Sequence, residues 1–149
     1  MTLRYDTVSF LSDYGRADEF VGVVHSVLRS LAPEARVVDI THDIAPYDVR
    51  AGGLALVRAA EYLAPGVVIA VVDPTVGTHR RPLAVEIGGG SSVLVGPDNG
   101  LLASVVNACG GPDRVVQITN PDVILEGRTG TFDGRDVFAP AAAFLCNGG

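Results

Sequence analysis

Basic residues are scarce in this sequence, since 11 of its 149 residues are Lys or Arg against 17 Asp or Glu. The formal net charge of −6 argues against a protein that grips nucleic-acid phosphates, because such proteins carry clustered cations. An acidic chain suits small-molecule chemistry, including a cationic ligand, although acidity mostly reflects solubility. We therefore expect a small-molecule partner and no nucleic acid.

Long apolar runs are also lacking. The N-terminal stretch MTLRYDTVSF has no apolar core of a signal peptide, and no run reaches the roughly 18 residues that span a bilayer. The two cysteines, Cys109 and Cys146, lie far apart, which favours buried free thiols over a disulfide framework. With 48% hydrophobic and 19% charged residues, the chain can bury a real core. We predict a soluble protein of the cytoplasm with no membrane partner.

Short β-rich runs alternate with helical periodicity along the first half of the chain. The predicted elements are a strand over 7–12, a helix over 18–31, a strand over 36–40, a helix over 48–63 and a strand over 67–73. The run VVIAVVD is nearly all apolar, as expected of a central strand covered on both faces. This order of elements is typical of a doubly wound sheet.

The order of elements changes in the second half. Three glycines at 88–90 join β-rich runs at 82–87 and 92–96 as in a β-hairpin, so part of the sheet should be antiparallel. The remaining predicted elements are a helix over 98–109, a strand over 113–119 and a helix over 136–146. Since neither a repeat nor a linker is found, we predict one α/β domain over residues 1–149. It should have three layers, α/β/α, around a mostly parallel, Rossmann-like sheet with an antiparallel hairpin.

Aspartates stand where three of the predicted helices begin. Asp18, Asp48 and Asp136 each precede an apolar periodic run, and aspartate is a preferred N-cap residue. Pro140 would then lie in the first turn of the last helix, where proline is tolerated. For Asp18, a role in ligand binding is an equal alternative.

Acidic residues also follow three of the predicted strands. The first strand ends before Asp13, the second runs into the stretch DITHD, and the third ends at Asp73. Ligands of open α/β sheets bind beyond the carboxyl ends of the strands, so we predict the site at this edge. Asp13 can accept hydrogen bonds from both hydroxyls of a ribose. Neither a GxGxxG nor a Walker motif supports a phosphate site.

The histidines permit two interpretations. Asp39, His42 and Asp43 resemble a metal cluster. Turn-forming side chains that bond to their own backbone are the favoured alternative. His25, inside a predicted helix, is interpreted as structural, and His79, beside two arginines, as solvated.

Arg80 follows Asp73 by seven residues, across a proline turn. A turn of this length can fold the guanidinium back onto the carboxylate, which would keep Asp73 ionised and fix its direction. The pair belongs either to a reaction site or to a structural ion pair that closes the turn.

Five stretches, in order over nearly the whole chain, resemble the S-adenosyl-L-methionine (SAM) hydroxide adenosyltransferases, or SAM hydrolases, which are relatives of the bacterial fluorinase and chlorinase. The stretches are FLSDYGRADEFVGVVHSVL, VVDITHDIAPYDVRAG, VVDPTVGTHRRPLAVE, LVGPDNGLL and TFDGRDVFAPAAA. The resemblance implies that water or hydroxide attacks the ribose 5′ carbon of SAM, giving adenosine and L-methionine, without a metal or other cofactor. A sulfonium group departs as a neutral thioether, so the enzyme has to place a water and help to remove its proton.

By position, the resemblance assigns Asp73 and Arg80 to a water-activating Asp-Arg-His triad and Asp13 to the carboxylate that holds the ribose diol. The other substrate contacts that it implies are Asp18, Tyr47, Val76, Thr131, Phe132 and Gly134. The halogenases have a tyrosine at the position of Asp73, and a carboxylate there would repel a halide. Water is therefore favoured over halide as the nucleophile.

Two departures from the family pattern affect the expected activity. Asp133 stands at the position of the triad histidine, and an ionised carboxylate only accepts hydrogen bonds. We hypothesise that Asp133 replaces the histidine as an orienting acceptor, with weaker or pH-shifted turnover. The family also carries a C-terminal β-rich domain that completes the adenine pocket in a homotrimer. We expect that domain to be absent from residues 1–149 and the affinity for SAM to be low.

Three alternatives to the SAM hydrolase remain open. The first is a non-catalytic domain that binds adenosine or SAM. The second is a metal-dependent hydrolase that uses Asp39, His42 and Asp43, and the third is a SAM-dependent halogenase.

Overall fold

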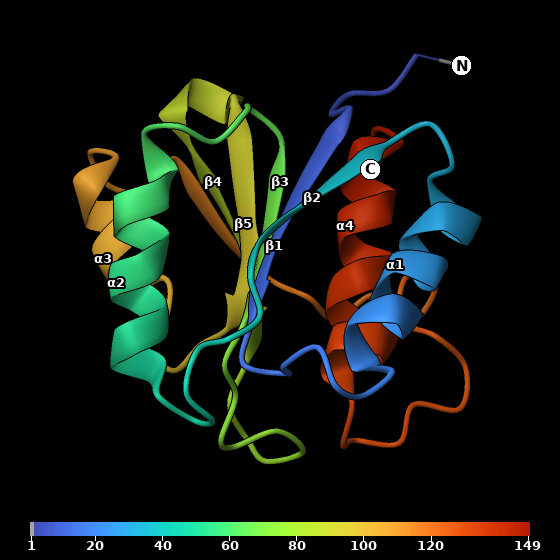
Figure 1. Ribbon diagram of the computed structural model, residues 1–149. Helices are drawn as coiled ribbons and strands as arrows, with labels where there is room; N and C mark the ends of the chain where they lie inside the picture. Colours follow the sequence, from blue (N-terminus) through green and yellow to red (C-terminus); the bar gives the residue numbers. More distant parts are fainter. Residues whose placement is uncertain (1) are drawn as a thin grey trace.

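The computed structural model describes residues 2–149. Within them, six strands form one sheet in the order β2-β1-β3-β5-β4-β6 (Figure 1). Its strands are β1 (Thr7–Ser12), β2 (Arg36–Thr41), β3 (Val67–Val71), β4 (Pro82–Ile87), β5 (Ser92–Pro97) and β6 (Arg114–Gln117). Strands β2, β1, β3 and β5 are parallel, and β4 runs antiparallel to both of its neighbours. The predicted mixed sheet with its antiparallel hairpin is confirmed.

Helices cover both faces of this sheet. Figure 1 shows α1 (Phe20–Leu31) and α4 (Ala139–Cys146) on one face, and α2 (Val49–Ala60) and α3 (Ala103–Ala108) on the other. The three-layer α/β/α prediction is therefore confirmed. In the described part of the chain, the helices are all too short or too polar to cross a bilayer.

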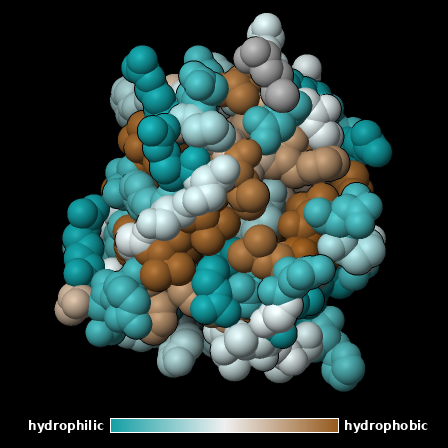
Figure 2. Space-filling view, turned by 90° about the vertical axis from the view of Figure 1, so that its right-hand side faces the viewer, coloured by the Kyte–Doolittle hydropathy of each residue, from teal (hydrophilic) through white to brown (hydrophobic). Residues whose placement is uncertain are grey.

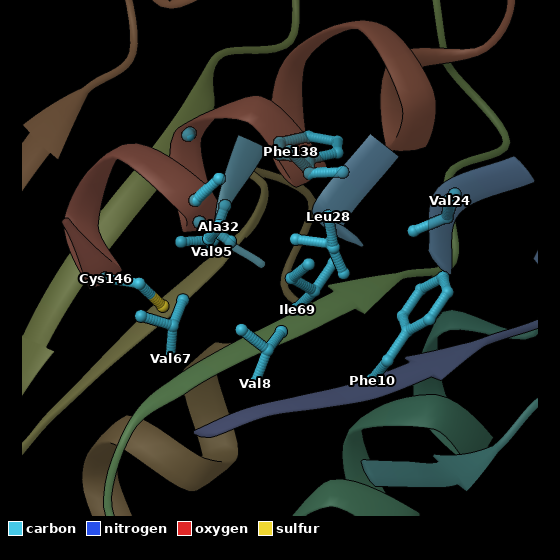
Figure 3. Packing of buried hydrophobic residues seen from close by; sticks show 14 of the residues in the cluster. Val8, Phe10, Val24, Leu28, Ala32, Val67, Ile69, Val95, Phe138 and Cys146 are labelled. Atoms are coloured by element: carbon cyan, nitrogen blue, oxygen red, sulfur yellow. The ribbon is translucent and has the colours of Figure 1, made fainter. Parts of the chain in front are cut away.

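The apolar strands are buried on both sides, which explains their uninterrupted hydrophobic runs. Val8 and Phe10 of β1 and Ile69 of β3 point toward α1 and α4, where they meet Leu28 and Phe138 (Figure 3). The alternate side chains of the same strands pack against α2 and α3. Burial of one such side chain contributes about 1.5–3 kcal/mol, so the central strands supply a rigid base for the loops at their ends.

The starts of α2 and α1 test two of the three predicted N-caps. Asp48 caps α2, since its Oδ1 accepts a 2.9 Å hydrogen bond from Ala51 N–H, as predicted. The cap prediction for Asp18 is wrong, because α1 begins later and Glu19 stands at its N-cap without a side-chain bond. The residues before α1 form a series of bends, and Asp18 is exposed there.

Several predicted elements are shorter in the structure, among them the strand expected over 67–73, which ends at Val71. The helix expected over 98–109 begins only at Ala103, because Asn99 binds the Val72 carbonyl at 2.8 Å and the Leu101 N–H at 3.1 Å, which holds its segment in a turn. The strand expected over 113–119 is limited to β6, an exposed edge strand. The helix expected over 48–63 ends at Ala60.

The last predicted helix begins with a wide π-helical turn, η2 (Gly134–Phe138), that runs into α4. The cap prediction for Asp136 is therefore wrong, because Asp136 lies inside this turn and is buried. Pro140 lacks the N–H that would bond to the Asp136 carbonyl four residues earlier. That carbonyl instead accepts a 2.9 Å hydrogen bond from Leu125 N–H, which ties the preceding loop to η2.

Candidate active site

The carboxyl ends of the parallel strands meet at the lower edge of the sheet in Figure 1, where the loops after β1 and β3 approach the loop before η2. A cavity of about 720 Å³ opens at this edge. Its lining includes most of the predicted site residues, namely Asp13, Asp18, Tyr47, Asp73, Val76, Thr131, Phe132 and Asp133. Arg80 and Gly134 lie behind this lining. The structure thus brings together side chains that are up to 120 residues apart in sequence.

A second cavity, of about 360 Å³, lies between α4 and the outer strands β4 and β6. The outer face formed by α1 and α4 carries apolar side chains framed by hydrophilic ones (Figure 2), with Leu31 and Phe144 both exposed there. The buried carboxylates Asp73 and Asp133 line the first cavity instead. Because ionised groups are almost never buried without a partner or a task, the first cavity is the candidate site.

Asp73 and Asp133 share the guanidinium of Arg80. Arg80 Nε donates to both oxygens of Asp73, at 3.1 and 3.0 Å, and Nη2 also bonds to Asp73 Oδ2. The same Nη2 donates to Asp133 Oδ2 at 2.7 Å. All three side chains are nearly inaccessible to solvent. The predicted pairing of Asp73 with Arg80 is present, and Asp133 completes a buried triad.

The pKa values of this triad follow from its contacts. Burial lowers the pKa of Arg80, but the bonds to Asp73 and Asp133 outweigh burial and raise that pKa. Burial raises the pKa of Asp133, but Arg128 and then Arg80 outweigh it and hold the pKa below its usual range. Arg80 and Asp133 therefore stay charged at neutral pH. The Arg80 guanidinium also lies 5.6 Å from the Phe138 ring centroid, which fixes its position.

The turn between Asp73 and Arg80 is shaped by a close backbone approach. Gly77 has φ of +80°, and a Cβ at this position would overlap the Gly130 carbonyl oxygen. Only glycine fits both conditions, so the loop after β3 can pass against the loop that leads into η2. This approach holds Asp73 and Asp133 close together.

Asp13 is held by the loop after β2. Tyr47 N–H donates to Asp13 Oδ2 at 2.7 Å, and Tyr47 adopts φ of 65°, a left-handed conformation that is uncommon for a side chain of this size. Such strain is found mostly where a ligand or a neighbouring loop needs the geometry. Here it places the Tyr47 backbone against Asp13 and the exposed Tyr47 ring beside the cavity.

The sequence interpretation missed Tyr14, which also lines the cavity. Its ring packs edge-on against Phe132, and its hydroxyl occupies the space that a Cβ on Gly134 would need. Burial, followed by the charges of Asp13, Asp73 and Asp133, raises the pKa of Tyr14, so its hydroxyl stays protonated. Tyr14 follows Asp13 directly in the sequence, and this position next to a predicted site residue could have indicated that Tyr14 lines the site. Other lining residues that were missed are Phe20, Pro46, Val71, Thr129 and Arg135.

Residues 8–149 match the family model for the N-terminal domain of SAM hydroxide adenosyltransferases. This chain belongs to the SAM hydroxide adenosyltransferase family. It is 52% identical to the (R)-S-adenosyl-L-methionine hydrolase of Salinispora arenicola, over 95% of this chain and 53% of that protein. A fluorinase of Nocardia brasiliensis is 29% identical, over 97% of this chain and 55% of that enzyme.

The fold of this family member has a close counterpart among solved structures. An uncharacterized conserved protein from Thermotoga maritima superposes with a TM-score of 0.90 at 36% identity, over 95% of this chain and 54% of that chain. The chain therefore spans about half the length of the relatives that it matches.

The DITHD stretch of this family member forms a hydrogen-bonded chain beneath the site. His42 is buried, and its Nδ1 lies 2.6 Å from Ser12 Oγ while its Nε2 lies 2.7 Å from Asp39 Oδ1. Ser12 Oγ also accepts from Tyr14 N–H at 3.2 Å. Both ring nitrogens of His42 are therefore engaged by side-chain oxygens of neighbouring strands, so the ring is fixed between Ser12 and Asp39.

His25 belongs to the same hydrogen-bonded network, which agrees with its interpretation as a structural residue. His25 Nε2 lies 2.9 Å from the same Asp39 oxygen. Burial raises the pKa of Asp39, but the bonds from His42 and His25 outweigh it and lower that pKa. Asp43 is exposed, with its N–H on Thr41 Oγ1. Over residues 2–149, His, Cys, Asp and Glu side chains do not gather in threes with a geometry suited to a metal ion.

Two smaller predictions have mixed outcomes. Cys146 is buried, and burial raises the pKa of its thiol to about 11, but Cys109 is exposed rather than buried because it follows α3 at the surface. His79 is exposed, as predicted.

Proposed function

We propose that this chain supplies the water-activating part of a SAM hydrolase, which converts SAM and water to adenosine and L-methionine. The observation that carries the proposal is the buried Asp73–Arg80–Asp133 cluster at the wall of a cavity that also contains Asp13. Family membership and the hydrolase name of a 52% identical relative support the choice of SAM as substrate.

The charge of the cavity suits a cation. Its lining carries four aspartates, of which Asp73 and Asp133 are offset by Arg80 and Arg128. Arg135 is paired with Asp136, so the charges of Asp13 and Asp18 remain. The sulfonium and ammonium groups of SAM are positive, so these carboxylates favour its binding. As the bond to sulfur breaks, the positive charge disappears and a neutral thioether leaves.

In the proposed step, the oxygen of a water attacks the 5′ carbon while the carbon–sulfur bond breaks and its electron pair stays on sulfur. Asp73 accepts the proton that the water loses and passes it to solvent. Arg80 holds Asp73 in one orientation through the bonds from Nε. The products are adenosine, L-methionine and a proton.

The remaining residues position the substrate in this proposal. Asp13 binds the ribose hydroxyls, since the hydrogen bonds of the described residues leave its Oδ1 available while Tyr47 occupies Oδ2. Tyr47, Val76, Thr131 and Phe132 form the walls around the ribose and the reacting carbon, and Asp18 faces the methionine end. Gly134 leaves room for the Tyr14 hydroxyl.

Water is the proposed nucleophile, because the carboxylate of Asp73 beside the reacting carbon would repel a halide ion. No metal or other cofactor takes part in this scheme. Since the chain spans about half the length of its relatives, we propose that the adenine end is completed by a further domain in a homotrimer.

The test is incubation of the chain with SAM in water enriched in oxygen-18, followed by chromatography and mass spectrometry. We expect adenosine that carries the label at its 5′ oxygen, unlabelled methionine, and a rate that a chelator does not change. Label in methionine, or SAM that is bound but never cleaved, would contradict the proposal. The second of these outcomes would establish a domain that only binds SAM.

A further inference from the structure

The two carboxylates of the buried triad are held by different numbers of cations. Asp133 accepts from Arg128 Nε at 3.0 Å through Oδ1 and from Arg128 Nη2 at 2.8 Å through Oδ2. It also accepts from Arg80 at 2.7 Å through Oδ2. Asp73 has the single guanidinium of Arg80, which it shares. Asp133 is thus enclosed by two arginines, one of them in a two-pronged geometry.

This second arginine balances the charge of the cluster. Asp73 and Asp133 together carry two negative charges, and Arg80 alone offsets one of them. The Asp133 side chain is completely buried, whereas the Arg128 side chain is 36% exposed, so the charge of Arg128 is brought in from the surface of the loop. Without it, two buried anions would compete for one guanidinium, and Arg80 would be drawn toward Asp133.

Arg128 is also held in place from the other side. The next residue, Thr129, donates its N–H to Asp136 Oδ2 at 3.2 Å, and Leu125 N–H donates to the Asp136 carbonyl. Asp136 therefore fixes the loop, and Arg128 extends from the fixed loop to Asp133. Asp133 and Asp136, the two aspartates of TFDGRD, therefore both bind the preceding loop, through Arg128 and Thr129 respectively.

We propose that Arg128 is a positioning residue of this site: by neutralising Asp133 it keeps Arg80 on Asp73 and leaves Asp73 as the carboxylate that takes the proton from water. Asp133 is then a fixed anion that orients Arg80 and does not act as a base. This inference rests on the proposed function for the proton transfer, while the placement of Arg80 stands on the contacts alone. The lowered pKa of Asp133 agrees with it.

The experiment compares Arg128→Gln and Arg128→Lys with the parent chain, and uses Arg58→Gln, an exposed arginine on α2, as the matched control. Nitrogen-15 NMR follows the Arg80 Nε–H, whose hydrogen exchange is slowed by its bonds to Asp73. In Arg128→Gln we expect this exchange to become about tenfold faster or more, because Arg80 is drawn toward Asp133. Lysine supplies the positive charge but not the two-pronged geometry of a guanidinium. In Arg128→Lys the Arg80 Nε–H should therefore exchange at a rate between those of Arg128→Gln and the parent chain.

Adenosine release from SAM gives a second readout. Arg128→Gln should lower kcat with little change in KM and move the acid limb of the pH profile to higher pH. In an Asp133→Asn background, the same substitution should add less than about a twofold loss, because the residues act as a unit. A merely structural ion pair would lower thermal stability without moving the pH profile.

Unchanged Arg80 Nε–H exchange in Arg128→Gln would overturn the inference, as would full additivity with Asp133→Asn. A parent chain that releases no adenosine would contradict the proposed function instead. The exchange measurement would still decide whether Arg128 positions Arg80.

Discussion

At the scale of single residues, the site depends on how buried charges are compensated. Asp73 and Asp133 are both buried and face one cavity, so each needs a cation or a hydrogen-bond donor. Arg80 bonds to both because its planar guanidinium can reach two carboxylates at once, and Arg128 supplies the second positive charge. A lysine at this position would offer three rotatable donors on one nitrogen but not the planar fork that fixes the direction of each carboxylate.

The first prediction concerns Asp73 as the acceptor of the water proton. Asp73→Asn retains the shape of the side chain but removes its basicity, so adenosine release should fall by about 10²–10⁴-fold. Chromatography of timed SAM incubations measures this rate. Asp98→Asn is the control, since Asp98 pairs with Arg81 at the surface. Release by Asp73→Asn within tenfold of the parent would exclude Asp73 as the base.

The second prediction concerns the buried histidine beneath the site. His42→Leu removes one hydrogen-bond partner from the buried Ser12 hydroxyl and one from Asp39, so the free energy of unfolding should fall by about 1–3 kcal/mol. Urea unfolding followed by circular dichroism measures this loss. His25→Leu removes a bond to the same oxygen of Asp39 at a half-exposed position and should cost less. Equal losses for the two variants would mean that burial of the network is unimportant.

At the scale of elements, the π-helical turn η2 is the least regular part of the fold and lies directly at the site. Asp133, at its N-terminal boundary, lines the cavity, and Asp136, inside it, binds the loop before it. Such π-helical turns are rare and occur often at functional sites. Here two observations account for its position, namely the missing N–H of Pro140 and the Leu125 bond to the Asp136 carbonyl.

The third prediction tests how η2 packs on the loop after β1. A Cβ on Gly134 would overlap the Tyr14 hydroxyl, so Gly134→Ala should lower the free energy of unfolding by about 1–3 kcal/mol. Tyr14→Phe removes that hydroxyl and should recover part of the loss in the double variant. A double-mutant cycle by urea unfolding measures the coupling. Strict additivity of the two changes would show that Gly134 and Tyr14 do not contact each other.

At the scale of the whole molecule, buried ionisable groups make stability depend on pH. The folded-state pKa values of Asp39, Asp133 and Asp136 are lowered by their partners. Their stabilisation is therefore present above the unfolded-state pKa of about 3.9 and is lost as pH falls through the lower folded values. Cys146 has a folded pKa raised to about 11, so its contribution is lost as pH rises through that value.

The fourth prediction is a broad maximum of stability near neutral pH. The free energy of unfolding should fall steadily below about pH 4 and again above about pH 8.5, where the unfolded thiol ionises. Denaturant titrations at a series of pH values measure it. Asp136→Asn removes one of the titrating carboxylates and should flatten the acid side. A free energy of unfolding that stays constant from pH 6 to pH 3 would contradict the lowered pKa values of Asp39, Asp133 and Asp136.

Much of the architecture could be predicted because it depends on local order in the sequence. Apolar runs such as VVIAV and the helical stripe of α1 specify elements through their periods, and alternating strands and helices lead to parallel pairing. This topology also predicts the carboxyl edge of the sheet as the site, because it puts Asp13 and Asp73 at the ends of neighbouring parallel strands. The pairing of Asp73 with Arg80 could also be predicted, because one short turn joins the two residues.

Only the tertiary structure shows the contacts between segments that are far apart in the sequence and share no recognisable spacing. Arg128 lies in an irregular loop without periodicity. Its role depends on its hydrogen bonds to Asp133, which exist because the fold packs this loop against the start of η2. Tyr14 and Gly134 are 120 residues apart and share one space. The capping role predicted for Asp136 is wrong because the helical turn already begins at Gly134, and the buried Asp136 side chain binds Thr129 N–H of the preceding loop. Periodic burial is written into neighbouring residues, whereas compensation of a buried charge depends on whichever groups the finished fold brings within hydrogen-bond distance.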